Sequence, residues 1–335
     1  SPTCVMHYED AKGWLVGDLN KGMKAMFIMM NGARLFVGIQ GIGLSETSYQ
    51  SALHYAKERL QGKLPESKNV ADPIIVHPEI RKNLMLMKSV NDGIRGLMLK
   101  AGNAFDIIDS NQTSKLTQTS ENLIALLTPI LKSFATDKAL EITNNALQVY
   151  GGHGYITDHG MEQLVRDARI LPIYEGTNGI QALDLIGRKF NIHEGQIIND
   201  YLSEIEEFLI SINDDQNMIK FIKLFKPSFI DLKDCVNFIK EIDINNTKEI
   251  NSHAMDFLNI FALVAVGYTW LQFIKISQDK IKKKDDIFYL SKIQLGEFFM
   301  TKVIFETKKY KNNIYSSGNL FNQFSDNYFE TGSYQ

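Results

Sequence analysis

Cysteine, tryptophan and proline are scarce in this chain of 335 residues, which holds 2, 2 and 7 of them. Two cysteines, Cys4 and Cys235, exclude a disulfide framework and a zinc site with four thiolate ligands, and they favour a reducing, cytoplasmic location. A large charge of either sign is also missing, because 36 basic residues face 39 acidic ones. Without a basic field, nucleic acid is not an expected partner. The 44% of apolar residues is typical of a folded protein.

Two further absences concern membranes and export. No charged stretch followed by an apolar one stands at the start, so we expect no export signal, and the chain reads as if it begins within a larger architecture. The apolar run at residues 257–271 is interrupted by Asn259 and is shorter than the ~20 residues that a spanning helix needs. We therefore predict a buried bundle helix there and no membrane span.

Arginine is absent from the last 147 residues. All seven arginines lie at or before Arg188, together with six of the seven prolines and 18 of the 23 glycines. Because the guanidinium is a rigid planar fork, the first part is the better place for sites of fixed geometry, and the second part is more typical of a scaffold. A coding bias toward lysine, asparagine and isoleucine is an alternative explanation.

The apolar periodicity predicts a mainly α-helical protein with three parts. Residues 1–20 hold two short strand-like runs, at 5–8 and 14–16, which indicate the remnant of a β-domain. Residues 21–190 form a four-helix bundle, and residues 191–335 form a helical extension. The predicted helices lie at residues 21–61, 78–108, 119–150 and 177–189, and then at 194–212, 216–241, 247–278 and 286–311.

The most informative residues are three blocks in fixed order: QVYGGHGY at 148–155, RDAR at 166–169 and IYEGTNGIQ at 173–181. Their order and spacing resemble the C-terminal helical domain of the acyl-CoA dehydrogenases, which are FAD enzymes. The resemblance is continuous from residue 1 to about Lys189. The segment 72–77 and the long tail are most similar to the subgroup that includes 3-methylmercaptopropionyl-CoA dehydrogenase.

Glu175 is the candidate catalytic residue. Oxidation of an acyl thioester needs a carboxylate that removes the α-proton in a water-poor slot, and Glu175 follows the apolar pair Ile173 and Tyr174. Gly176 adds no side chain that would block a substrate. A glutamate on a surface loop is the structural alternative. The resemblance implies that Glu175 is the general base, that the β-hydride goes to the flavin N5, and that the product is a 2,3-enoyl-CoA.

Several residues are candidate FAD contacts. Glycines at positions 151 and 152 permit backbone geometries closed to other residues and bring amides near a ligand, although a helix stop explains one of them. The resemblance implies that Gln148, Gly151 and Gly152 contact the FAD of the other subunit. Thr177 is a good N-cap for the next helix, and it also matches a family contact to FAD. Asn178 and Gln181 are weaker candidates.

Four further candidate positions are arginines. By resemblance, Arg59 meets the FAD pyrophosphate across a dimer, but the Phe-Gly pair that often follows in the family is missing here. A solvated charge at the helix end is the alternative. Arg34 matches a substrate-side arginine, and an ion pair within the bundle explains it equally well. Arg166 and Arg169 are predicted to form ion pairs that hold the Glu175 loop.

The resemblance also implies partners and a deficit. It implies an acyl-CoA substrate, a homodimer or dimer of dimers, and an electron-transfer flavoprotein as acceptor. Family members carry an N-terminal helical domain and a complete β-domain before this point, so we expect residues 1–335 alone not to turn over. An acyl-CoA oxidase and a non-catalytic helical dimerisation protein are the alternative functions. No metal site is expected, because His153 and His159 lack a third ligand at suitable spacing.

Overall fold

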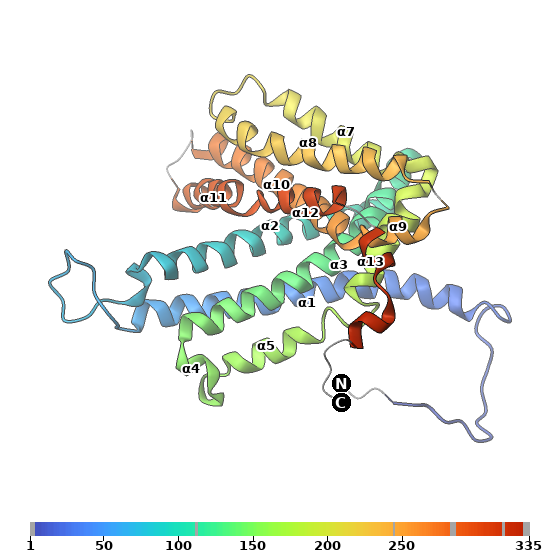
Figure 1. The fold of residues 1–335 in the computed structure, drawn as a ribbon, viewed down its shortest axis with the longest axis horizontal. Helices are drawn as coiled ribbons and strands as arrows, with labels where there is room; N and C mark the ends of the chain where they lie inside the picture. The colour runs from blue at the N-terminus through green and yellow to red at the C-terminus, as the bar shows by residue number, and fades with distance from the viewer. Residues whose placement is uncertain (1–3, 111–112, 244, 282–285, 317–318, 331–335) are drawn as a thin grey trace.

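The computed structural model describes residues 4–110, 113–243, 245–281, 286–316 and 319–330, and these residues are predominantly helical (Figure 1). The helices in chain order are α1 (Gly22–Glu58), α2 (Pro78–Asp109), α3 (Ser114–Tyr150), α4 (Gly152–Tyr155), α5 (Met161–Arg169), α6 (Asn178–Leu183), α7 (Gln196–Ser211), α8 (Ile219–Glu241), α9 (Thr247–Ser252), α10 (Ala254–Ile281), α11 (Ile287–Phe298), α12 (Glu306–Tyr315) and α13 (Asn319–Gln323). Short 3₁₀ turns lie at Ile74–Val76, Thr157–His159, Lys189–Gly195 and Asp326–Glu330, and π-helical turns lie at Asp184–Arg188 and Phe299–Val303.

Three long helices, α1, α2 and α3, lie side by side and form the first bundle, as the periodicity predicts (Figure 1). Pro78 is the first residue of α2, where its missing N–H leaves no hydrogen bond unmade. Gly41 of α1 lies against α3, because a Cβ added there would be 2.9 Å from the Ala135 carbonyl oxygen. Glycine is therefore needed where these two helices approach most closely.

The fourth bundle helix is shorter than predicted. It begins where expected, because the Thr177 hydroxyl accepts a hydrogen bond from the Ile180 N–H at 3.3 Å and caps α6. The α-helix ends at Leu183 and continues as the π-helical turn Asp184–Arg188. The predicted single helix over 177–189 is therefore a helix with a bulged end.

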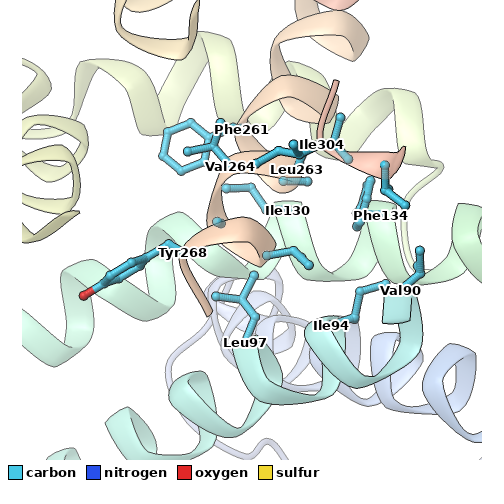
Figure 2. Close-up of a cluster of buried hydrophobic side chains, with 14 of the residues drawn as sticks. Val90, Ile94, Leu97, Ile130, Phe134, Phe261, Leu263, Val264, Tyr268 and Ile304 are labelled. Atoms are coloured by element: carbon cyan, nitrogen blue, oxygen red, sulfur yellow. The ribbon is translucent and has the colours of Figure 1, made fainter. Parts of the chain in front are cut away.

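The helical extension shares the core of the bundle through α10. Figure 2 shows Val90, Ile94 and Leu97 of α2 and Ile130 and Phe134 of α3 facing side chains of α10. The indole of Trp270 in α10 donates a hydrogen bond to the Ser89 carbonyl of α2 at 3.0 Å. The predicted scaffold region is thus packed directly on the bundle rather than folded apart from it.

Two helices, α1 and α10, are long and apolar enough to cross a membrane by length and composition alone. The apolar window of α10 is 83% buried within the protein, which confirms the prediction of a core helix at residues 257–271. The corresponding window of α1 is 33% buried, and Met23, Phe27 and Met29 near its start are exposed.

The two strands predicted within residues 1–20 are not formed among the described residues of that segment. Residues 4–20 are non-helical, unpaired and exposed, with Trp14 at 85% of its accessible surface. A strand is stable only when a neighbour accepts its backbone hydrogen bonds, and no other strand of the described chain lies beside this segment. The two strands are thus not formed here, and the assignment of residues 1–20 to the end of a β-domain stays a prediction.

Candidate active site

Glu175 lies in the tight loop of residues 172–178 that joins α5 to α6. Its φ of 56° and the φ of 84° at Gly176 place two consecutive residues in the left-handed region. The loop is closed by a hydrogen bond of 3.0 Å from the Asn178 N–H to the Pro172 carbonyl. Left-handed backbone is strained for a residue with a side chain, and such strain is frequent at functional positions. The left-handed backbone at position 176 therefore favours glycine. This reason adds to the one expected from sequence, which is that a side chain there would block a substrate.

A lysine that sequence reasoning did not single out lies beneath this loop. The Lys132 side chain of α3 is 0% exposed, and its Nζ donates to the Gly176 carbonyl and to Asn178 Oδ1, both at 2.9 Å. Burial lowers the pKa of Lys132 to about 8, against the opposing charge of Asp137. The sequence signal was a single lysine inside the apolar run at residues 129–135.

Asn178 is held by the same group of residues. Its amide donates to the Ser133 carbonyl at 3.1 Å, to Thr136 Oγ1 at 3.0 Å and to Asp137 Oδ1 at 2.7 Å, and the residue is 6% exposed. Burial raises the pKa of Asp137 despite the hydrogen bond from Asn178. The Asn178 side chain therefore fastens the loop to α3, and its contact with a cofactor stays a prediction.

Two further side chains near the loop, Gln181 and Arg34, keep unpaired polar atoms among the described residues. Gln181 is fully buried, and its amide lies 3.4 Å from the Glu175 carbonyl, while its Oε1 has no partner among the described residues. Arg34 is 7% exposed, and its Nε also lacks a partner among them. The Arg34 guanidinium reaches Asp184 at 4.0 Å, which is the ion pair that the sequence left open. Buried unpaired groups of this kind are rare, and they commonly lie where a ligand binds.

The predicted ion pairs of Arg166 and Arg169 are not formed within the described part of the chain. Among the described residues, the side chains of the RDAR block make one hydrogen bond, which Gln163 donates to Asp167 at 2.7 Å, and the charge of Arg169 acts to lower the pKa of Asp137. The loop is held instead by Lys132, Asn178 and Gln181 from the α3 and α6 side. Sequence order suggested the wrong neighbours, because α5 ends before the loop turns back onto α3.

The other candidate residues meet at the C-terminal end of α3. Arg59, Gln148, Gly151 and Gly152 all line one open cavity of about 670 Å³, which we call the Arg59 cavity. Gly151 has a φ of 61° and ends α3, and a Cβ at Gly151 or Gly152 would meet no other atom within 4 Å. The backbone at both positions is therefore open to a ligand.

Aromatic side chains complete the Arg59 cavity. Tyr55 and Tyr150 stack with ring centroids 4.1 Å apart, and the Tyr55 hydroxyl lies 2.8 Å from Nδ1 of His153. The guanidinium of Arg59 is exposed, and no ion pair or side-chain hydrogen bond joins it to another described residue. A free cation beside open glycine backbone and flat aromatic rings suits a ligand that carries both anionic and planar groups.

The two groups of candidates are separated along α3. Gly151 lies 19 residues after Lys132, which is about 28 Å at 1.5 Å per residue. Thr177 lies beside Glu175, at the middle of α3. The other four residues lie in the Arg59 cavity at the C-terminal end of α3: Arg59, Gln148, Gly151 and Gly152. The structure thus divides the predicted cofactor residues into two places.

Comparison with known proteins matches both halves of the chain. Residues 20–190 match the family model described as acyl-CoA dehydrogenase, C-terminal domain, and residues 201–322 match the one described as acetyl-CoA dehydrogenase C-terminal like. A 3-methylmercaptopropionyl-CoA dehydrogenase of Ruegeria pomeroyi is 43% identical over 56% of this chain and 32% of its own length. A butyryl-CoA dehydrogenase of Syntrophomonas wolfei is 28% identical over 91% of this chain and 52% of its own length.

The likeness in structure extends through the helical extension. An acyl-CoA dehydrogenase of Bacillus anthracis, solved in complex with FAD, superimposes with a TM-score of 0.71 over 89% of this chain and 50% of its own, at 18% identity. The chain therefore spans about half the length of such relatives, or less. The match over residues 20–190 covers half of the chain in its own right. The chain belongs to the acyl-CoA dehydrogenase family.

Proposed function

We propose that this chain provides the catalytic base and part of the FAD site of an acyl-CoA dehydrogenase, which converts an acyl-CoA thioester to a 2,3-enoyl-CoA. The observation that carries the proposal is the 172–178 loop, where Glu175 is half-buried in left-handed backbone and three side chains hold the turn. Glu175 removes the α-proton of the substrate. The fixed loop keeps its carboxylate in one orientation, which is what a general base requires.

The residues present fit a flavin dinucleotide in two places, the Arg59 cavity and the start of α6 beside Glu175. At the Arg59 cavity, the unpaired guanidinium suits a pyrophosphate, and the open backbone of Gly151 and Gly152 suits close approach. Near Glu175, Thr177 is exposed at the start of α6, where its hydroxyl is within reach of a ligand. When bound, the flavin would accept the β-hydride of the substrate.

We further propose that each flavin site is shared by two chains in a homodimer. One chain would provide Glu175 and Thr177, and its partner would provide Arg59, Gln148, Gly151 and Gly152. The separation of about 28 Å along α3 supports this division. Arg34 and Gly176 would face the acyl-CoA, an electron-transfer flavoprotein would accept the electrons, and the location would be cytoplasmic.

The test is turnover of acyl-CoA thioesters by the full-length protein with an artificial electron acceptor. We expect Glu175→Gln to lower kcat by roughly 10³-fold or more while acyl-CoA still binds, because the amide cannot take a proton. Glu194→Gln is the matched control, since Glu194 is also a left-handed glutamate but is exposed and lies elsewhere. Unchanged turnover in Glu175→Gln would contradict the proposal.

The same assay separates the alternatives. An acyl-CoA oxidase would produce hydrogen peroxide with oxygen as the sole acceptor, whereas a dehydrogenase would depend on the added acceptor. A full-length protein that binds neither FAD nor acyl-CoA, yet dimerises, would favour the non-catalytic interaction protein.

A further inference from the structure

The buried cation of Lys132 has no role in the proton transfer described above. Its Nζ is bound by two neutral oxygens, those of Gly176 and the Asn178 side chain, and no ion pair joins it to any described residue. A buried ammonium without a bonded counter-charge is costly, and an apolar side chain of similar length would fill the same space at lower cost. Stability of the bundle alone therefore does not account for a lysine here.

Both of its acceptors belong to the loop that carries Glu175. The left-handed turn at Glu175 and Gly176 directs the Gly176 carbonyl inward, where Lys132 meets it at 2.9 Å. The second bond, to Asn178 Oδ1, holds the residue at which α6 begins. Lys132 thus donates hydrogen bonds to the residues on both sides of Thr177 in the strained turn.

The charges that act on Lys132 come from three elements. Asp137 on its own helix α3 and Glu175 on the loop favour the ammonium form, while Arg34 on α1 opposes it. Glu175 is therefore held by bonds through its neighbours and is also attracted by the same charge.

We infer that Lys132 is the positioning residue for Glu175, holding the 172–178 loop in its strained turn through the Gly176 carbonyl and Asn178. This inference rests on the proposed function for its catalytic consequence, but the order of the loop can be measured without turnover. Lys132 itself does not touch the substrate in this account.

The protonation of Lys132 gives a distinctive readout. As the pH rises through the lowered pKa of about 8, the side chain loses one donor and its attraction to the Glu175 carboxylate, so the loop should become less ordered. The same group has the opposite effect on global stability. Its ordinary value is 10.5, so between about 8 and 10.5 the unfolded chain binds the extra proton, and the free energy of unfolding from this group rises with pH.

The experiment is hydrogen exchange of the peptide covering residues 172–181 between pH 6.5 and 9.5, corrected for the intrinsic exchange rate. The Asn178 amide, which bonds to the Pro172 carbonyl, is the central probe. In the wild type we expect protection to fall by roughly threefold or more as the pH passes 8. In Lys132→Met we expect low protection at every pH, with no step. Lys138→Met is the matched control, since Lys138 is also buried in α3 but pairs with Glu141 at 2.7 Å.

A second variant, Lys132→Gln, keeps the inference testable if Lys132→Met does not fold. It keeps hydrogen-bond donors without a charge, so we expect intermediate protection that does not change near pH 8. In the full-length protein it should lower kcat roughly tenfold with little change in KM, and remove an alkaline limb near pH 8.

Two outcomes would overturn the inference, and they differ from failure of the proposed function. Folded Lys132 variants that keep the wild-type protection and its pH step would show that Lys132 does not position the loop. A wild-type protein without any step near pH 8 would contradict the titration of this lysine. If Glu175→Gln left turnover unchanged, the catalytic role would fail while the exchange result for the loop would still stand.

Discussion

The middle of α3 and its C-terminal end handle their polar groups in opposite ways. Near Lys132, the side chains of Asn178, Thr136 and Asp137 are bonded to one another and to the loop. Near Gly151, the Arg59 guanidinium has no partner in the described chain, and the Gly151 backbone bonds only to its own turn, at Gln148 and Gly154. The first place is bonded internally, and the second leaves a cation free for the proposed cofactor.

This contrast follows from the proposed roles of the Glu175 loop and the Arg59 cavity. A base must be held in one orientation before the substrate arrives, so its support is internal and buried. A dinucleotide carries its own charge and rings, so the protein needs to present complementary groups on an accessible surface. A substitution should therefore damage structure and activity together near Lys132, and ligand affinity alone near Gly151.

The largest effect that would break this contrast is expected from Gly176→Ala. A residue with a Cβ at φ 84° is strained by about 1–3 kcal/mol, and the added atom would lie 2.8 Å from Gln181 Nε2. We expect loss of stability in thermal unfolding, together with a fall in kcat of roughly 10–100-fold.

Gly152→Ala is the control for that experiment. Gly152 lies in α4, and a Cβ there would meet nothing within 4 Å. We expect unchanged stability without ligand, and any loss should be confined to flavin affinity. Equal destabilisation by the two substitutions would show that the Glu175 loop and the Arg59 cavity do not differ as described.

A smaller effect is expected from Arg59→Ala. Because Arg59 is exposed and has no partner in the described chain, its removal should leave the unfolding temperature of the ligand-free protein unchanged. Loss of a charge-assisted contact should weaken FAD binding roughly tenfold, and more so at low salt. Lys57→Ala, an exposed cation in the last turn of the same helix, should not alter FAD binding. A change in stability without a change in affinity would give Arg59 a structural role instead.

The sequence predicted the bundle better than the details of its site. Long amphipathic helices and the Thr177 cap depend on local periodicity and local hydrogen bonds, so both could be predicted from the chain alone. The hydrogen bonds of Asn178 could not be predicted from the sequence, because they join it to residues of α3 more than 40 positions away. The two N-terminal strands failed because strand pairing depends on a neighbour that the segment itself does not contain.

The role of Lys132 was equally out of reach of the sequence. A lone lysine in an apolar helical stretch is visible in sequence, but its purpose appears only when the loop at residues 172–178 folds back onto it. Likewise, the four candidates of the Arg59 cavity were predicted one by one from the resemblance, and the fold brings them together.

The central claim is that the Glu175 loop and the Arg59 cavity of one chain belong to two different flavin sites of the proposed dimer, and a mixed dimer tests it most directly. Differently tagged full-length chains carrying Glu175→Gln and Arg59→Ala/Gln148→Ala would be co-expressed, and the hybrid isolated. If each site takes one of these parts from each chain, one site of the hybrid is intact, and we expect about half of the wild-type activity at an FAD concentration that leaves the Arg59→Ala/Gln148→Ala parent mostly unloaded. Hybrid activity no higher than that of the parents would place the Glu175 loop and the Arg59 cavity of one chain in the same site and contradict the account.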